Sequence, residues 1–313
     1  MATPLWPSSH SLAVPPALAS QAPRENLPSA WLAQVDTVWL PLAAWVGAQV
    51  ERTVSTPIVG IHGGQGSGKS TLSRALADWY HAAFGWHVVV VSIDDLYLPH
   101  QQRQTLAETI HPLLATRGVP GTHDVRMGIE LMHRLRALTP GQTLHFPKFH
   151  KLSDDRLPQD QWHQVSGKVD LILFEGWCVA CPAQSAEQLH HPINDLERHN
   201  DAQGVWRTWV NQQLQGDYQA WFALLDQLIM LQVPDMHAVY RWRQQQERDN
   251  RAQTATGQPN RSLDDAALQR FIQHYQRLTE HALKTLPKQA DVVLTLNAAH
   301  QVNQIQLNAE APQ

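Results

Sequence analysis

The chain has 313 residues, of which 43% are hydrophobic, so it is long enough to bury the core of one large domain or two small ones. Its formal net charge of −4 and its pI near 6.5 come without a basic arm, which argues against nucleic-acid binding. Two cysteines in a chain of this length favour a reducing compartment, and we expect the cytoplasm.

The N-terminal part of the chain differs in composition from the rest. Residues 1–28 are rich in Pro, Ala and Ser and lack the basic start of a signal peptide, so we expect a flexible extension. Residues 29–54 contain an apolar run, but Asp36 and Pro41 within it argue against a membrane span. We therefore predict a helical segment that packs on the following domain, and no membrane partner.

A domain over residues 55–300 is predicted from short apolar runs that alternate with helical patterns, and residues 301–313 are expected to form a C-terminal tail. The apolar runs are continuous, as in strands buried on both faces of a parallel sheet. This order predicts an α/β fold with a doubly wound, mostly parallel sheet flanked by helices. The expected strands are Ile58–Ile61, Val88–Ile93, Val169–Phe174, Leu228–Val233 and Val292–Leu296, and the expected helices are about Lys69–Phe84, Asp124–Leu138, Val205–Leu224, Asp235–Gln253 and Leu263–Leu286.

The first expected strand runs into GGQGSGKST, which fits the phosphate-binding pattern G-x-x-x-x-G-K-[ST]. Glycines allow backbone amides to curl around an anion, and a helix that begins near Lys69 points its positive end at the phosphates. We expect Lys69 to reach the β- and γ-phosphates of a nucleotide and Ser70 to ligate Mg²⁺. The residues expected to bind the nucleotide are Gly63, Gly64, Gln65, Gly66, Ser67, Gly68, Lys69, Ser70 and Thr71.

Carboxylates follow the second and third expected strands. Asp94 and Asp95 end the second strand, and Glu175 ends the third. Ligands of open α/β sheets bind at the carboxyl ends of the strands, so these groups are expected beside the phosphate-binding loop. One aspartate is predicted to accept the proton of an attacking hydroxyl, and Glu175 and Asp94 are expected near Mg²⁺, directly or through water. Strand geometry leaves the choice of base open, because neighbouring residues point in different directions.

Residues 96–167 form a segment that is too long for a simple crossover connection between two strands. Insertions of this kind build substrate loops in α/β enzymes. Basic groups in the segment suit a small anionic acceptor, because they bind carboxylates through charge-assisted hydrogen bonds. The alternative is a solvated surface charge, an interpretation that suits Lys151 and Arg156 better than Arg117. The groups considered are Arg117, His123, Lys148, His150, Lys151 and Arg156.

The expected helix 235–253 carries several arginines, and residues 252–260 have the Gly, Pro and Thr content of a mobile loop. Arg241 and Arg248 are seven residues apart and share a helix face. A lid helix that brings an arginine over the γ-phosphate suits phosphoryl transfer, in which charge spreads over the transferred oxygens. The alternative is a solvated charged face, and spacing does not choose between Arg241, Arg243 and Arg248.

Cys178 and Cys181 have the C-x-x-C spacing of a redox pair or of half a zinc site. A structural zinc site needs four ligands, and the sequence offers no second cysteine pair. We interpret both cysteines as small apolar side chains that follow a strand.

The segments GGQGSGKS, DDLYL and FEGW together resemble the P-loop small-molecule kinases that include uridine kinase, phosphoribulokinase, pantothenate kinase and D-glycerate 3-kinase. RGVPGTHDV, FPKFHKLSDDRLPQDQW and VPDMHAVYRWRQQQE are similar to segments of the glycerate kinases. The resemblance runs from about residue 55 to 300. It implies an ATP- and Mg²⁺-dependent enzyme that phosphorylates a hydroxyl of a small metabolite, with D-glycerate as the expected acceptor.

This resemblance favours Asp94 over Asp95 as the base, and Phe149-His150 departs from it because Tyr-Asp is usual there. CVAC after FEGW is a second departure. The alternatives are the same chemistry on a nucleoside, pantothenate or another hydroxy acid, and a nucleotide-dependent switch or ATPase without a small acceptor. The residues implied at the acceptor site are Asp95, Tyr97, Arg117, Thr122, His123, Asp124 and Lys148.

Overall fold

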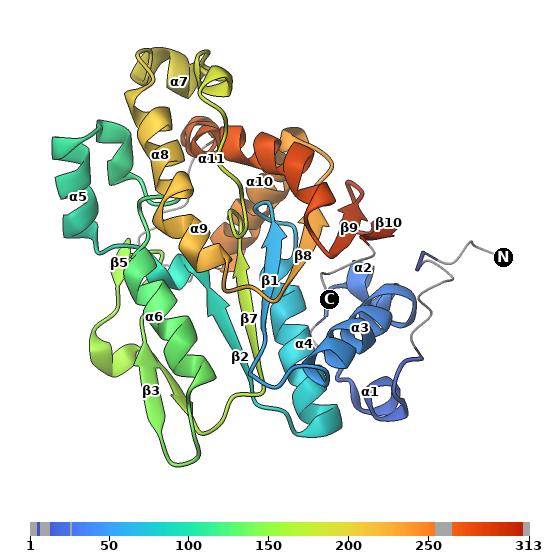
Figure 1. Ribbon diagram of the computed structural model, residues 1–313. Helices are drawn as coiled ribbons and strands as arrows, with labels where there is room; N and C mark the ends of the chain where they lie inside the picture. The colour runs from blue at the N-terminus through green and yellow to red at the C-terminus, as the bar shows by residue number, and fades with distance from the viewer. Residues whose placement is uncertain (1–4, 7–12, 26, 254–264, 309–313) are drawn as a thin grey trace.

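The computed structural model describes residues 5–6, 13–25, 27–253 and 265–308, with side chains omitted for 249–253. Its centre is a six-stranded sheet in the order β10-β9-β8-β1-β7-β2, in which β10 alone is antiparallel to its neighbour (Figure 1). The strands are β1 Ile58–Gly63, β2 Val88–Ser92, β7 Leu171–Gly176, β8 Gln227–Gln232, β9 Val292–Leu296 and β10 Val302–Leu307.

Both faces of the sheet are buried. In β1, Ile58 belongs to one hydrophobic core while Val59 and Ile61 belong to the other, because successive side chains of a strand point to opposite faces. In β7, Leu171 and Leu173 likewise share one core, and Ile172 and Phe174 pack in the other. Burial on both faces explains the continuous apolar runs, and the predicted fold class is confirmed.

Helices cover the two faces of the sheet (Figure 1). Helices α6, α8, α9 and α11 supply residues to one core, and α1, α3, α4 and α10 supply residues to the other. Gly216 divides the expected helix 205–224 into α8 and α9, because its backbone leaves the helical region. The helices are α1 Pro16–Gln21, α2 Ser29–Leu32, α3 Leu40–Val50, α4 Lys69–Phe84, α5 His100–Thr109, α6 Val125–Arg136, α7 Asp195–Asn200, α8 Val205–Gln215, α9 Asp217–Phe222, α10 Met236–Gln253 and α11 Asp265–Thr285.

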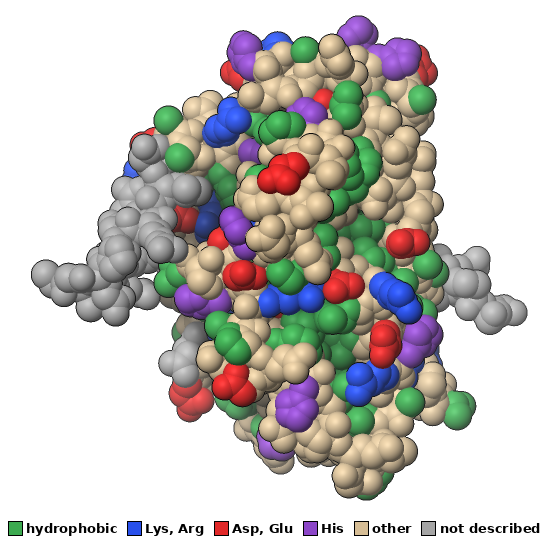
Figure 2. All heavy atoms as spheres, turned by 90° about the vertical axis from the view of Figure 1, so that its left-hand side faces the viewer, with side chains coloured by type: hydrophobic (Ala, Val, Ile, Leu, Met, Phe, Trp, Pro, Cys, Tyr) green, Lys and Arg blue, Asp and Glu red, His purple; other side chains and the backbone are tan. Residues whose placement is uncertain are grey.

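The long insertion lies beyond β2, at the edge of the sheet (Figure 1). It contains α5, α6 and two small antiparallel sheets, β3–β6 and β4–β5. On this face of the molecule, acidic and basic side chains are interspersed (Figure 2). The strands of the small sheets are β3 Thr143–Phe146, β4 Phe149–His150, β5 Asp155–Arg156 and β6 His163–Ser166.

The chain segments outside the expected domain also pack against it. In α1, Leu18 is fully buried, and the Trp79 indole of α4 donates to Pro23 O at 2.7 Å, so this part of the expected flexible extension is packed on α4. Strand β10 lies within the expected tail 301–313, so the sheet continues past residue 300. Residues 1–4, 7–12, 26 and 309–313 lie outside the described part of the chain. Within the described residues, no helix combines the length and apolar character needed to cross a membrane.

Candidate active site

The phosphate-binding loop follows β1 and lies against helix α10. Gly66 and Gly68 have φ values of +77° and +93°, in the left-handed region that favours glycine. A Cβ at Gly66 would lie 2.8 Å from the Cβ of Trp242, so α10 crosses the loop closely. The His300 ring, on the connection from β9 to β10, brings Nε2 to 2.9 Å from Gly66 O. Glycine conformations and two neighbouring elements therefore shape the loop.

Polar side chains of the loop keep hydrogen-bonding capacity. The amide of Gln65 and the hydroxyl of Ser67 are buried and have no hydrogen-bond partner among the described residues. Buried polar groups are normally satisfied, so unused groups beside a glycine-rich loop and a helix N-terminus fit a site that binds a polar ligand. The loop residues 63–71 predicted from the sequence come together here.

Lys69 begins α4, and its ammonium turns back into the loop. Nζ donates to Gly64 O at 3.2 Å. Burial lowers the pKa of Lys69, and the negative charges of Glu175 and Asp94 oppose that shift. The ammonium therefore lies near the loop backbone and two carboxylates, where it can meet nucleotide phosphates.

Ser70, in the first turn of α4, and Glu175, near the carboxyl end of β7, bring two oxygens together. The Ser70 hydroxyl donates to Glu175 Oε1 at 2.8 Å, and Glu175 is buried. Among the described residues, no group of three or more His, Cys, Asp or Glu is arranged to hold a metal ion. Mg²⁺ in kinase sites uses one or two protein oxygens, with phosphates and water completing its shell, so this pair fits that ion.

Asp94 lies at the carboxyl end of β2, the neighbour of β7 in the sheet. Its Oδ1 accepts a hydrogen bond from the Tyr97 hydroxyl at 3.0 Å, and its Oδ2 accepts one from Lys151 Nζ at 2.7 Å. Burial opposes ionisation, but the Lys151 ammonium outweighs it and holds the pKa of Asp94 well below its usual range. The carboxylate is therefore ionised at neutral pH.

Asp95 faces other partners. Its Oδ1 accepts from the backbone N–H of Phe149 at 3.0 Å, and its Oδ2 lies 3.2 Å from His163 Nε2. These contacts hold the start of β4 and the start of β6 to the end of β2. The geometry therefore gives the two aspartates different partners, because Asp94 binds Lys151 and feels the charge of Lys69, whereas Asp95 holds the starts of β4 and β6.

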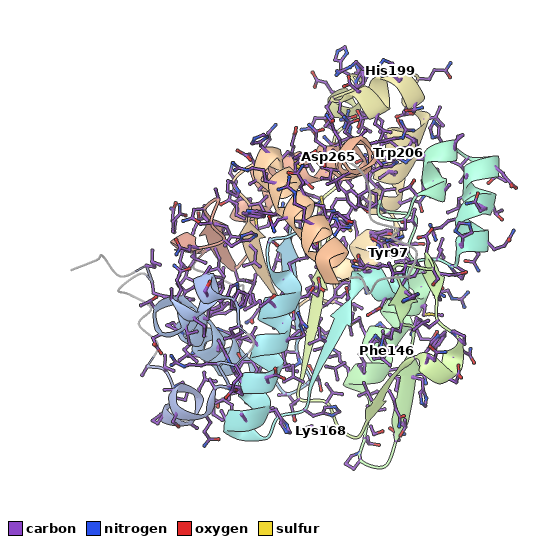
Figure 3. All side chains as sticks on the ribbon, turned by 180° about the vertical axis from the view of Figure 1, so that it is seen from behind. Tyr97, Phe146, Lys168, His199, Trp206 and Asp265 are labelled. Carbon is purple, nitrogen blue, oxygen red and sulfur yellow. The ribbon has the colours of Figure 1, made fainter. Side chains whose placement is uncertain are left out.

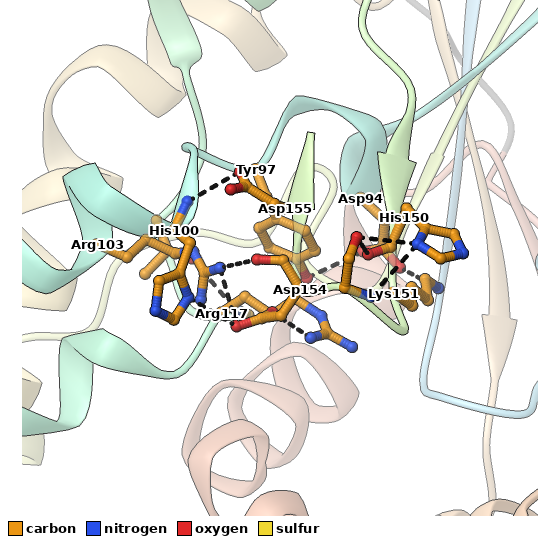
Figure 4. Close-up of polar contacts among 12 residues, drawn as sticks. Asp94, Tyr97, His100, Arg103, Arg117, His150, Lys151, Asp154 and Asp155 are labelled. Carbon is orange, nitrogen blue, oxygen red and sulfur yellow. Dashed lines mark hydrogen bonds and ion pairs between the residues drawn. The ribbon is translucent and has the colours of Figure 1, made fainter. Parts of the chain in front are cut away.

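Arg117 belongs to a cluster built around Asp154 (Figure 4). Its Nη1 forms an ion pair with Asp154 Oδ1, and its guanidinium lies 5.5 Å from the Phe149 ring centroid. Arg103, which is fully buried, pairs with Asp154 Oδ2 at 3.0 Å and donates to three backbone carbonyls. Arg103 is thus committed to the fold, whereas in the described residues the other Arg117 nitrogens have no hydrogen-bond partner.

Thr122 and His123 lie in the buried floor of the insertion. Thr122 Oγ1 accepts from Gly118 N–H at 3.0 Å and donates to Val119 O at 2.7 Å, so it closes a tight loop. His123 stacks on Tyr97 with ring centroids 4.4 Å apart. Burial lowers the pKa of His123 to about 3, so its ring is neutral and cannot hold an anion by charge.

Two other residues implied at the acceptor site, Asp124 and Lys148, lie apart from each other in different elements. Asp124 caps α6, because its Oδ1 accepts from Met127 N–H at 3.1 Å, and its Oδ2 pairs with Arg156 at 3.2 Å. Lys148 is exposed at the start of the β4–β5 hairpin. Asp124 therefore has an evident structural role, whereas the charge of Asp94 acts on its neighbour His123.

The arginines of α10 point in several directions. Arg241 and Arg248 are exposed, and Arg243 forms an ion pair with Glu247. The Arg243 charge also acts on Tyr275, which donates to Arg117 O at 3.1 Å. The side chains of residues 249–253, including Arg251, and the whole of 254–264 lie outside the described residues, and so does most of the expected mobile loop.

The two cysteines are buried thiols. Burial raises the pKa of Cys178 well above its usual value and that of Cys181 to about 12, so both are protonated at neutral pH. A buried, protonated thiol packs as a small apolar group, as the sequence predicts.

Comparison with known proteins shows the family of this chain. No protein-family model matches the chain. The chain is 34% identical over 227 residues to the uncharacterized kinase mug58 of Schizosaccharomyces pombe, with 70% of this chain and 78% of that protein covered. This chain belongs to the P-loop small-molecule kinases. As a member of that family it is a phosphotransferase that acts on a hydroxyl acceptor.

Two other comparisons found proteins with D-glycerate 3-kinase in their names. It is 28% identical over 236 residues to the chloroplastic D-glycerate 3-kinase of Arabidopsis thaliana, which covers 73% of this chain but only 48% of that longer protein. The solved structure of a D-glycerate 3-kinase from Cryptococcus neoformans var. grubii superposes with a TM-score of 0.72 at 22% identity, over 86% of this chain and 99% of that one. The structural likeness shows that the two share a fold.

Proposed function

We propose that this kinase transfers the γ-phosphoryl group of ATP, with Mg²⁺, to a hydroxyl of a small hydroxy acid, and that the acid is D-glycerate. The observation that carries the proposal is the four-residue turn 151–154 between β4 and β5, in which Lys151 contacts Asp94 and Asp154 contacts Arg117. The candidate base Asp94 and the candidate carboxylate-binding group Arg117 thus contact opposite ends of one short turn. That span suits an acceptor of a few carbons with a carboxylate at one end.

In the proposed reaction, Asp94 accepts the proton of the acceptor hydroxyl. The hydroxyl oxygen forms a bond to the γ-phosphorus, and the bond from that phosphorus to the bridging oxygen of ADP breaks. The low pKa of Asp94, set by Lys151, keeps the carboxylate in the form that can accept a proton. Arg117 binds the acceptor carboxylate with the guanidinium nitrogens that Asp154 leaves unused.

The phosphates of ATP are proposed to lie on the backbone amides of residues 63–71, with Lys69 at the β- and γ-phosphates. Ser70 and Glu175 would hold Mg²⁺ there, and the buried Glu175 carboxylate supports this because it already contacts the Ser70 hydroxyl at 2.8 Å. When bound, Mg²⁺ neutralises charge on the β- and γ-phosphates. We retain an arginine of α10 as a proposed lid group, with Arg241 and Arg248 as the candidates because they are exposed, whereas Arg243 is paired with Glu247.

The choice of D-glycerate among hydroxyl acceptors is supported by two features. The Arabidopsis thaliana relative with 28% identity carries the name D-glycerate 3-kinase. In addition, Phe149 packs under Arg117 and Arg103 at 5.5 and 5.9 Å and so supports the arginine cluster, which favours an acceptor with a carboxylate, although Phe149 itself departs from the family pattern. Another hydroxy acid remains the second candidate because Arg117 would bind its carboxylate equally well.

The experiment is an acceptor panel with the unaltered chain, ATP and Mg²⁺, in which ADP release is followed for D-glycerate, L-glycerate, glycerol, pantothenate and uridine. We expect D-glycerate to have the highest kcat/KM, and glycerol, which lacks the carboxylate, to be poor. Arg117→Ala should raise KM for D-glycerate about 10–100-fold, because a hydrogen bond to a charged group contributes about 1.5–3 kcal/mol, and should leave the glycerol rate unchanged. Arg134→Ala, on the exposed face of α6, is the matched control. A preference for glycerol or uridine would contradict the proposal.

A further inference from the structure

Lys151 lies beside the candidate base Asp94, and its charge acts on groups next to the phosphate-binding loop. Its Nζ donates to Asp94 Oδ2 at 2.7 Å (Figure 4). The same ammonium attracts Glu175, the partner of Ser70, and repels the ammonium of Lys69. Electrostatic interactions weaken with distance, so Lys151 faces the region between the phosphate-binding loop and the end of β2.

The turn that carries Lys151 is fixed at its base and exposed at its tip. Asp154 binds the fully buried Arg103, and Arg156 Nε donates to Tyr97 O at 2.7 Å. By contrast, the Lys151 side chain is 63% exposed, and the Asp94 side chain that it contacts is 29% exposed. An exposed lysine on a flexible stem can change its partner without disturbing the hairpin beneath it.

We propose that Lys151 is a catalytic residue that binds the γ-phosphate of ATP and pairs with Asp94 only while that phosphate is absent. A terminal phosphate carries more negative charge than a carboxylate and offers more acceptor oxygens, so it competes for the ammonium. Transfer of Lys151 to the phosphate frees Asp94 Oδ2 to accept a hydrogen bond from the acceptor hydroxyl. The ammonium then stabilises charge on the oxygens of the transferring group.

In the described part of the chain, Lys151 is the cation that forms an ion pair with Asp94, while Lys69 is the cation of the phosphate-binding loop. Arg241 and Arg248 are exposed on α10, and Arg243 is paired with Glu247. Arg117 is paired with Asp154, at the other end of the turn. The inference rests on the proposed function, because it takes ATP as the donor and Asp94 as the base.

The test compares the affinities for ATP and for ADP, measured by calorimetry with Mg²⁺ and without any acceptor. ADP lacks the γ-phosphate, so Lys151→Ala should weaken ATP binding about tenfold or more relative to ADP binding. Lys151→Met, which keeps the stem but removes the charge, should behave alike, and Lys151→Arg should recover part of the preference for ATP. Lys168→Ala is the control, because Lys168 is exposed at the opposite end of the sheet from Tyr97 (Figure 3).

Turnover should fall about 10²–10³-fold in Lys151→Ala. Equal weakening of ATP and ADP, or no weakening of either, would overturn the proposal and leave Lys151 as a partner of Asp94 alone. The affinities do not depend on the acceptor, so they decide the role of Lys151 even if the acceptor panel excludes D-glycerate. The panel uses the unaltered chain, so its outcome does not depend on Lys151 substitutions.

Discussion

Asp94→Asn and Asp95→Asn are expected to fail in different ways, although they alter neighbouring carboxylates. In Asp94→Asn, the amide oxygen can still accept from Tyr97, and the Lys151 ammonium that loses its ion pair is 63% exposed and returns to solvent. The free energy of unfolding should therefore change by less than about 1 kcal/mol. Turnover should fall about 10²–10⁴-fold, because an amide cannot accept the proton of the acceptor hydroxyl.

In Asp95→Asn, the loss should appear in stability. Asp95 accepts from the backbone N–H of Phe149 and contacts His163, and its side chain is 20% exposed. A hydrogen bond to a charged group contributes about 1.5–3 kcal/mol, and the amide retains only part of it, so we expect a loss of about 1–2 kcal/mol. Turnover at saturating substrate should stay within about tenfold of the unaltered chain, because the contacts of Asp95 are with Phe149 and His163 of the insertion.

The assays are single-turnover phosphoryl transfer to D-glycerate and denaturation in urea, both performed on each variant. Asp78→Asn, which alters an exposed carboxylate of α4, is the control and should change neither quantity. If Asp95→Asn proves inactive at full stability while Asp94→Asn keeps its turnover, the assignment of the base is wrong by one residue. If both variants transfer at the normal rate, neither aspartate takes the proton in the rate-determining step.

Three further predictions follow from the same geometry. Lys69→Ala should abolish transfer and leave the denaturation midpoint nearly unchanged, because its ammonium makes one hydrogen bond to Gly64 O; a folded variant with normal turnover would refute the assignment of the loop. Ser70→Ala should raise the Mg²⁺ concentration needed for half-maximal activity by about tenfold or more, and an unchanged requirement would place the ion elsewhere. Burial opposes ionisation of Asp154, but Arg103 and Arg117 hold its pKa below the usual value. The ionised carboxylate therefore contributes its full stability above the unfolded-state pKa near 3.9, and this contribution is lost as the pH falls below about 3.9. Asp154→Asn should therefore reduce the fall in unfolding free energy between about pH 5 and pH 3, and denaturation curves with an unchanged pH dependence would contradict this.

The sheet and the phosphate-binding loop follow from local signals. Each central strand is buried on both faces, so its apolar run is visible without knowledge of its neighbours. The glycine pattern and the helix Lys69–Phe84 lie within one continuous stretch of sequence. Strand β10 lacks this signal because it is an edge strand with exposed positions, and the packing of residues 13–25 depends on α4, far along the chain.

The different roles of Asp94 and Asp95 could not be predicted from the sequence alone. Asp95 is held by Phe149 and His163, and Asp94 by Lys151, and each partner is more than fifty residues away along the chain. The interpretation of Lys151 as a solvated charge misses its ion pair for the same reason. The similarity of its segment to that of the glycerate kinases is the signal that draws attention to it.

The central claim is that the chain moves a phosphoryl group from ATP to D-glycerate and does not release it to water. The most direct measurement is ³¹P NMR of a reaction containing the unaltered chain, ATP, Mg²⁺ and D-glycerate. We predict a new phosphate monoester resonance that grows in equal amount with ADP, and no growth of that resonance with Asp94→Asn. Formation of ADP with inorganic phosphate as the only other product, at a rate that D-glycerate does not change, would contradict the claim.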